Sequence, residues 1–166
     1  MRRYRYYLIL LFSISILVGI GGWEILSPSH HRAEDYTPLF AAATGGDLAT
    51  VREAVDKDRS LLRATEWDNA TLLHDAVGQN HQDLATYLLD KGANVNAATK
   101  DGITALHMAA QNGNLDIMKL LLERGAKIDV VDSKGWTPTD RAVKWSHPDA
   151  GEFLRQRGGN EGTSAR

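Results

Sequence analysis

The pattern of apolar and polar residues along this chain repeats at a fixed step of 33 residues. The segment Thr71–Ala76 returns as Thr104–Ala109 and, in weaker form, as Thr137–Ala142. In the two clear copies, threonine is followed two positions later by leucine and then by histidine, and the segment closes on alanine. A fixed step of this length predicts stacked units, each of which buries its apolar faces against its neighbours.

Each unit is expected to contain a turn followed by two helices. The threonine is a suitable helix N-cap, because its hydroxyl accepts a backbone N–H of the first turn. Asn69, Gly102 and Gly135 stand two residues before it, and these residue types tolerate the positive φ of a tight turn. The second helix is richer in large apolar residues than the first, and we expect it to end at Gly92 or Gly125 in the central units.

The pattern resembles that of the ankyrin-repeat family over about three quarters of the chain. The resemblance implies an all-α solenoid of helix-turn-helix units with short β-hairpin fingers and a concave binding face. By register, the four repeats are expected at about 35–66, 67–99, 100–132 and 133–159. The family shares no common substrate or cofactor, so the resemblance implies no enzymatic activity.

The outer repeats depart from the pattern. Phe40 stands where the central repeats carry histidine, and Thr37 lies one residue further from the next threonine than the regular step. In the last repeat, Thr139 and Asp140 replace the leucine and the histidine. Polar residues at these positions predict a solvent-facing cap at the end of the stack. We expect residues 160–166 to form a disordered tail.

The N-terminal segment at 1–23 has the pattern of a signal peptide or a membrane anchor. Three arginines precede an apolar run that is free of charge, and a short polar linker is expected at 24–34. A cleaved signal peptide needs a small-x-small site, which 19–21 offers. A retained anchor needs about 20 apolar residues, and Tyr6–Trp23 provides 18. Both interpretations stay open, with the anchor favoured.

The basic head of this segment predicts a location across a membrane. Arginines before an apolar run remain on the cytoplasmic side, so the repeats are expected on the extracytoplasmic side. We therefore expect a single-pass membrane protein, in a bacterial envelope or periplasm. The alternative is a secreted or periplasmic protein from which the signal has been cleaved.

Charge and cysteine content exclude several kinds of site. The net charge of the chain is −2, and its body is mildly acidic without a basic run, which argues against nucleic acid as the partner. There is no cysteine, so disulfides, thiolate metal sites and cysteine nucleophiles are excluded. The sequence also lacks a glycine-rich phosphate loop and a nucleophile motif.

The histidines do not indicate a catalytic or metal site. His74 and His107 occupy the same position in two repeats, and we interpret them as structural residues that bond within and between repeats. The pair His30-His31 lies in the linker without further ligands at a suitable spacing. We therefore expect no enzyme, no catalytic residue, no cofactor, no metal and no small-molecule substrate.

The resemblance implies that partner specificity resides at the finger tips and at the end of each first helix. Three of the four tryptophans fall at such positions, and tryptophan is frequent at binding hot spots. The same side chains can instead pack between fingers, and both roles stay open here. By register, the candidate partner-binding residues are Tyr36, Trp67, Asp68, Ala70, Gln79, Lys100, Asp101, Ile103, Gln111, Asn112, Ser133, Lys134, Trp136, Lys144 and Trp145.

The predicted function is a non-catalytic protein–protein interaction module, exported or tethered to a membrane, that binds another protein through the concave face. An alternative is an inhibitor or immunity-type protein that occludes an extracytoplasmic enzyme. A structural spacer is a third hypothesis, and its exposed face should tolerate substitution everywhere.

Overall fold

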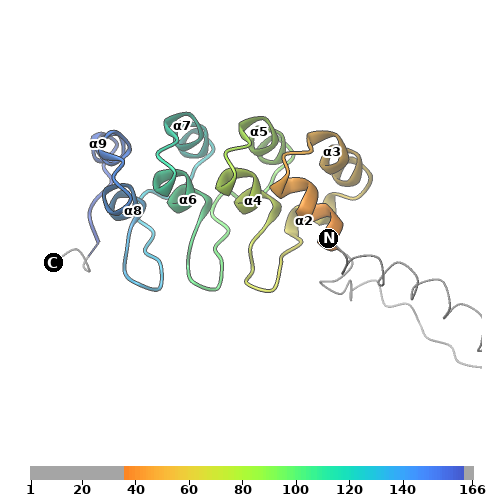
Figure 1. The fold of residues 1–166 in the computed structure, drawn as a ribbon, viewed down its shortest axis with the longest axis horizontal. Helices are drawn as coiled ribbons and strands as arrows, with labels where there is room; N and C mark the ends of the chain where they lie inside the picture. The colour runs from red at the N-terminus through yellow and green to blue at the C-terminus, as the bar shows by residue number, and fades with distance from the viewer. Residues whose placement is uncertain (1–35, 163–166) are drawn as a thin grey trace, which may run out of the picture. The chain divides into compact units, whose positions relative to one another are not determined.

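The computed structural model describes residues 36–162 as four helical pairs stacked in one row (Figure 1). The first helices, α2, α4, α6 and α8, lie side by side in one layer, and the second helices form the other layer. This arrangement confirms the expected all-α stack of repeats. The pairs are α2 (Thr37–Thr44) with α3 (Leu48–Lys57), α4 (Leu72–Gly78) with α5 (Gln82–Asp90), α6 (Ala105–Gln111) with α7 (Leu115–Glu123), and α8 (Pro138–Lys144) with α9 (Pro148–Gln156).

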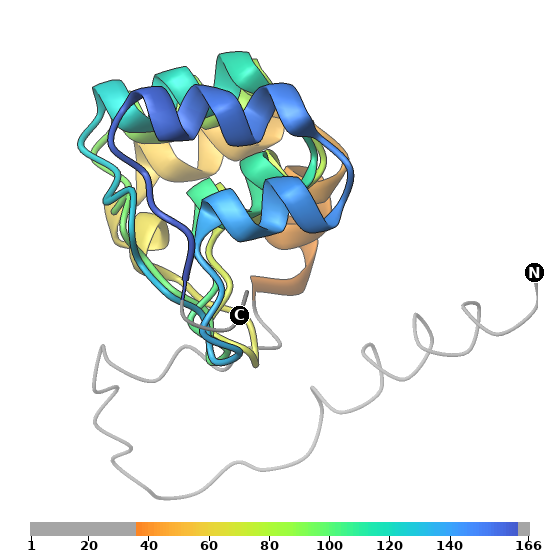
Figure 2. The ribbon, with the colours of Figure 1, turned by 90° about the vertical axis from the view of Figure 1, so that its left-hand side faces the viewer.

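Three loops, residues 65–71, 98–104 and 131–137, project from the same side of the stack (Figure 2). We call them the fingers of repeats 2, 3 and 4, and we count each finger with the repeat of the helix that follows it. Each is closed by an equivalent backbone hydrogen bond of 2.9 Å, which in repeat 2 runs from the N–H of Glu66 to the carbonyl of Ala70. The expected β-hairpins are reduced to isolated bridges in the fingers of repeats 2 and 3, and residues 36–162 contain no β-strand. The ladder stops after one pair because a helix begins directly after each finger.

The turn residues of the fingers have the predicted backbone conformation. Asn69, Gly102 and Gly135 have φ values of 66°, 73° and 74°. Glycine and asparagine tolerate this left-handed region better than other residues, so the fingers turn there with little strain. This confirms the prediction made from their position two residues before each threonine.

The core lies between the two layers and between successive repeats. Leu106 of α6 and Leu121 of α7 are fully buried, and burial of such a side chain stabilises the fold by about 1.5 to 3 kcal/mol. Ala76, Ala109 and Ala142 occupy one position of α4, α6 and α8 and are also fully buried. Their small side chains allow these three helices to approach closely.

The first repeat begins differently from the expectation. Helix α2 starts at Thr37 with Tyr36 as the N-cap, so this threonine is inside the helix rather than at its cap. The physical reason is Phe40, which is buried and apolar and cannot accept a backbone N–H as histidine does at this position. The extra residue of this repeat falls near a 3₁₀ turn, η2 (Arg59–Arg63), where the others have a helix-ending glycine.

The last repeat corrects a second expectation, because Thr139 and Asp140 are buried rather than facing solvent. The chain after α9 lies against them. The hydroxyl of Thr137 donates to the carbonyl of Asn160 at 2.8 Å, and the N–H of Gly162 donates to Oδ2 of Asp140 at 2.8 Å. Residues 160–162, assigned above to a disordered tail, therefore close the end of the stack.

The predictions for the signal or anchor at 1–23 and the linker at 24–34 lie outside the described residues. Within 36–162, no helix is both long enough and apolar enough to span a membrane. This finding overturns the predicted localisation, a single-pass membrane protein with extracytoplasmic repeats. Neither a signal nor an anchor is shown.

Candidate functional site: the inner surface

The fingers and the adjoining sides of α4, α6 and α8 form one continuous surface, which we call the inner surface (Figure 1). Neighbouring fingers are joined at their tips. The N–H of Lys100 donates to the carbonyl of Asp68 at 2.7 Å, and the N–H of Ser133 donates to that of Asp101 at 2.8 Å. Residues at equivalent positions of successive repeats are therefore neighbours on this surface.

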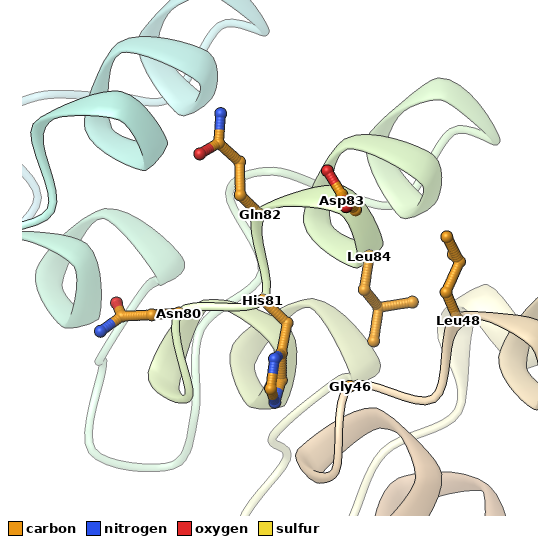
Figure 3. Close-up of a pocket in the computed structure, with 7 residues that line it drawn as sticks. All are labelled: Gly46, Leu48, Asn80, His81, Gln82, Asp83 and Leu84. Atoms are coloured by element: carbon orange, nitrogen blue, oxygen red, sulfur yellow. The ribbon is translucent and has the colours of Figure 1, made fainter.

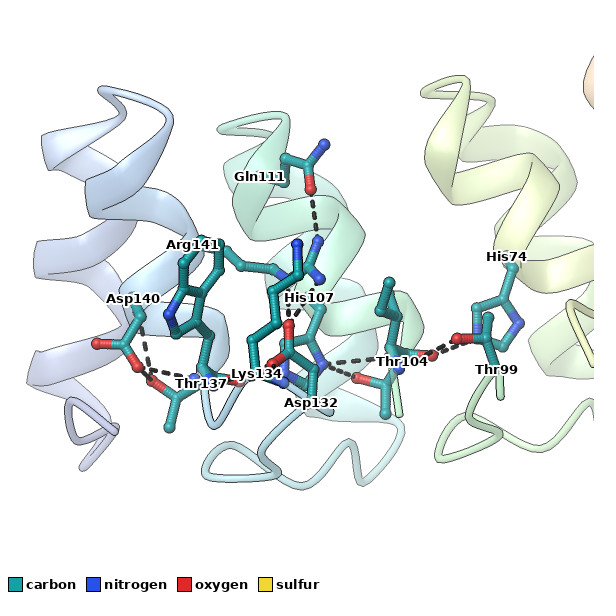
Figure 4. Close-up of polar contacts among 12 residues, drawn as sticks. His74, Thr99, Thr104, His107, Gln111, Asp132, Lys134, Thr137, Asp140 and Arg141 are labelled. Carbon is teal, nitrogen blue, oxygen red and sulfur yellow. Dashed lines mark hydrogen bonds and ion pairs between the residues drawn. The ribbon is translucent and has the colours of Figure 1, made fainter. Parts of the chain in front are cut away.

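A histidine in each central repeat ties that repeat to the finger of the next (Figure 4). Nδ1 of His107 accepts the N–H of Thr104 at 3.1 Å, and its Nε2 lies 3.0 Å from the carbonyl oxygen of Trp136. Because Nδ1 is an acceptor, Nε2 carries the hydrogen and donates it to that carbonyl. His74 makes the equivalent bonds and reaches the carbonyl of Ile103.

The environment of these rings supports the structural role expected for them. Both are buried, and burial lowers the pKa of His74 and of His107, although the bonds to backbone carbonyls act in the opposite direction. The imidazoles are therefore uncharged at neutral pH. Their two nitrogens are occupied by backbone groups, so they hold fingers in place and are not available for acid–base chemistry.

Arg141 of α8 fixes the finger of repeat 4 to its first helix (Figure 4). Its Nη2 and Nε donate to Oδ2 of Asp132 at 2.7 and 3.1 Å, and its Nη1 donates to Oε1 of Gln111 at 2.6 Å. Asp132 also accepts the N–H groups of Lys134 and Trp136. Burial alone would raise the pKa of Asp132, but these hydrogen bonds outweigh it and hold the pKa below its ordinary value.

Two tryptophans and two lysines surround this buried ion pair. The ring centroids of Trp136 and Trp145 are 5.8 Å apart with planes at 75°, an edge-to-face contact. The Nζ atoms of Lys134 and Lys144 lie 5.3 and 5.9 Å from the Trp136 centroid, and the guanidinium of Arg141 lies 5.6 Å from that of Trp145. Cations at such distances are attracted by the ring. Trp145 nevertheless remains 40% exposed, so repeat 4 presents an aromatic surface rimmed by cations.

Repeat 2 presents the opposite charge. Glu66 and Asp68 lie in its finger, and Asp75 lies on α4. Burial raises the pKa of Asp75 to about 7, and the nearby carboxylates of Glu66 and Asp68 add to the rise, whereas the side chain of Thr44 lowers the pKa by a smaller amount. Oδ2 of Asp75 is buried and has no hydrogen-bond partner in the described part of the chain. No lysine or arginine of residues 36–162 forms an ion pair with these carboxylates.

A separate hollow of about 350 Å³ lies where repeats 1 and 2 meet at α3 and α5 (Figure 3). The imidazole of His81 lines this hollow, and its Nε2 lies 2.9 Å from the carbonyl oxygen of Thr44. The ring also covers Gly46, where an added Cβ atom would lie 2.5 Å from Nδ1 of His81. The ring therefore joins two repeats. None of the lining side chains is a serine, cysteine or lysine that could act as a nucleophile: they are Gly46, Leu48, Asn80, His81, Gln82, Asp83 and Leu84.

Comparison with known families decides the identity of the repeats. The sequence model of the family described as ankyrin repeats (many copies) matches residues 73–122 and 113–155, which together cover half of the chain. The chain belongs to the ankyrin-repeat family. Ankyrin-repeat proteins are generally non-catalytic and bind other proteins.

Two relatives match this chain over a short segment. The palmitoyltransferase akr1 of Schizosaccharomyces pombe is 36% identical over 63 residues, which are 38% of this chain and 10% of that protein. Alpha-latrocrustotoxin-Lt1a of Latrodectus tredecimguttatus is 37% identical over 60 residues, 36% of this chain and 4% of the toxin. The chain thus spans a small part of each relative, and the matches carry neither relative's activity to it.

The candidate partner-binding residues fall into two groups on the ankyrin stack. Trp67 is 79% exposed at the tip of its finger, and Trp145 caps the end of α8 at the other end of the inner surface. In contrast, Gln111 bonds to Arg141, and the amide of Asn112 donates to the carbonyl of Gly78 at 2.9 Å. The second group serves the contacts between repeats. A binding role stays a prediction for every candidate, Trp67 and Trp145 included.

Three charged residues of the inner surface are absent from the candidates predicted from the sequence: Glu66, Asp75 and Arg141. The signal was present in the step of 33, since Asp75 and Arg141 occupy one helix position two repeats apart. In the ankyrin pattern this position is variable, so the motif residues alone do not indicate its role. In repeat 4 the side chain at this position, Arg141, bonds to Asp132 of the finger, so its charge determines whether the finger carboxylate is neutralised.

Proposed function

We propose that this chain is a non-catalytic binding module that holds a partner protein against the inner surface. The observation that carries the proposal is the half-exposed Trp145, which packs edge-to-face on Trp136 beside the cations of repeat 4. Large aromatic side chains with a polar rim are typical of binding hot spots. Trp67 offers a second exposed aromatic at the finger of repeat 2.

The construction of the stack supports the same proposal. Histidine bonds tie the fingers of repeats 3 and 4 to the preceding repeats, and backbone bonds join the finger tips. A surface that is already ordered loses little conformational entropy when a partner binds. The inner surface therefore suits recognition of a protein without rearrangement of its backbone.

The test is Trp145→Ala, with Leu115→Ala as a matched control. Leu115 is 39% exposed, almost as much as Trp145, but it begins α7 in the second layer. A partner is first recovered with the parent protein and then titrated with each variant. Loss of a hot-spot tryptophan should weaken binding by about 2 kcal/mol or more, roughly thirtyfold in the dissociation constant.

Chemical denaturation of the same variants separates binding from folding. Trp145→Ala loses the edge-to-face contact with Trp136 and the cation–π contact with Arg141, so its free energy of unfolding should fall by about 1 to 2.5 kcal/mol. The proposal fails if both variants bind the partner equally well. It also fails if Trp145→Ala unfolds the stack so severely that the tryptophan belongs to the core.

A further inference from the structure

The charges of the inner surface change sign along the stack. The charged side chains that repeat 2 contributes to this surface are all carboxylates, whereas Lys134 and Lys144 flank the tryptophans of repeat 4. Repeat 3 lies between them and carries one charge of each sign, Lys100 and Asp101. The Nζ of Lys100 lies 5.8 Å from the ring centroid of Trp67 in the finger of repeat 2, and within residues 36–162 it forms no ion pair with Glu66 or Asp75. A partner that lies along this surface therefore meets negative potential at one end and positive potential at the other.

Equivalent positions of repeats 2 and 4 show what the acidic end lacks. By the step of 33, Glu66 corresponds to Asp132 and Asp75 corresponds to Arg141. In repeat 4 the finger carboxylate is neutralised by the helix guanidinium at 2.7 Å. In repeat 2 both positions carry carboxyl groups, so a guanidinium or ammonium from outside would take the place that Arg141 fills in repeat 4.

The carboxyl group of Asp75 supports this assignment independently. Its Oδ2 is buried without a hydrogen-bond partner among residues 36–162, and its pKa is raised to about 7. A buried polar oxygen without a partner is unfavourable, and so is like charge nearby. A cation bound between Asp75 and Glu66 would relieve the charge repulsion.

We propose that the inner surface binds an extended peptide segment of a partner that carries a basic side chain at one end and an acidic side chain at the other. The basic group binds Glu66 and Asp75, and the acidic group binds Lys134 and Lys144 beside Trp145. This inference rests on the proposed function. Packed helices lie about 8 to 10 Å apart and an extended chain rises about 3.3 Å per residue, so the two charges should be about five or six residues apart.

A display library of random peptides, about twelve residues long so that each spans the two ends in extended form, tests this proposal with the whole chain as bait. Parent protein should enrich peptides with a basic and an acidic residue at that spacing. Glu66→Lys should remove the preference for the basic residue, and the double variant Lys134→Glu, Lys144→Glu should remove that for the acidic one. The best peptide from the parent should lose affinity about tenfold or more with either variant, because like charges then face each other.

Matched controls reverse exposed charges of the second-helix layer and the loop after it. Glu123→Lys pairs with Glu66→Lys, and the double variant Lys119→Glu, Lys127→Glu pairs with the double variant of repeat 4. These controls should leave peptide affinity unchanged. Urea denaturation of each variant, with Glu66→Gln as a milder change, ensures that a loss of binding is not a loss of folding.

The outcomes separate this inference from the proposed function. Peptides that depend on Trp145 but show no ordered pair of charges overturn the inference and leave the binding module intact. Peptides whose binding is indifferent to Trp145→Ala and to every charge reversal on the inner surface overturn both. Failure of the library to enrich any sequence also overturns the inference, because an extended segment is then not what this surface holds.

Discussion

Replacement of Asp75 by asparagine should stabilise the repeat stack, and should do so more at alkaline than at acidic pH. In the folded protein, burial and the carboxylates of Glu66 and Asp68 raise the pKa of Asp75 from 3.8 to about 7. The unfolded chain ionises this group near its ordinary value. Between about pH 4 and pH 7 the folded state therefore binds more protons at this residue, and stability falls as pH rises through that window.

The size of the effect follows from the pKa. A rise from 3.8 to about 7 corresponds to about 4 kcal/mol of lost stability once the group is ionised in both states. Asp75 is only partly buried, so solvent screening reduces this figure, and we expect about 1 to 2 kcal/mol. Asparagine keeps the shape without the charge. The variant should recover this amount at about pH 8 and less than half of it at about pH 4.

Urea denaturation of parent and Asp75→Asn at both pH values measures this difference. His74 and His107 act in the opposite sense, because burial lowers their pKa and acidification favours the unfolded chain. They are present in both proteins, so their effect cancels when the two are compared. Glu123→Gln changes an exposed carboxylate of α7 and should show no such dependence on pH. An advantage of Asp75→Asn that is equal at the two pH values would refute the reasoning.

Two further predictions concern stability. Leu106→Ala should lower the free energy of unfolding by about 2 to 5 kcal/mol, because it leaves a cavity in the most regular repeat, and a loss no larger than that of Leu115→Ala would contradict this. Gly162→Ala should cost about 1 to 2 kcal/mol, since a methyl group there collides with the carbonyl of Gly135 and lies 2.7 Å from Oδ2 of Asp140, displacing the bond to the N–H of residue 162. An unchanged urea midpoint for Gly162→Ala would show that this segment does not contribute to stability.

Much of the fold was predictable from the sequence because local and repeated signals agree. Threonine, histidine and the turn residues recur at one step, and each acts within its own repeat or on the next. Helix positions and the positive φ of Asn69, Gly102 and Gly135 followed from this register. The histidine role was also accessible, because a residue that recurs once per repeat in a helix cap serves the stack.

The details that escaped prediction depend on contacts between residues outside the repeat motif. The neutralisation of Asp132 by Arg141 requires the finger to fold back on α8, which hydrophobic periodicity does not report. Burial of Thr139 depends on the chain after α9, whose composition resembles a flexible tail. Tyr36 became the cap of α2 because Phe40 removed the side chain that fixes threonine elsewhere. Charge placement and terminal contacts therefore need the structure.

Asp140 stands where the central repeats carry histidine, and this difference affects whether two copies of the stack can associate end to end. In the central repeats the histidine donates a hydrogen to a carbonyl of the following finger, whereas Asp140 accepts one from the N–H of Gly162. The direction of the hydrogen bond at this position is thus inverted at the end of the stack. A finger from a second copy that offered its carbonyl here would place two oxygen lone pairs against each other, which is repulsive. The last repeat therefore resists end-to-end polymerisation through the very contact that joins the other repeats.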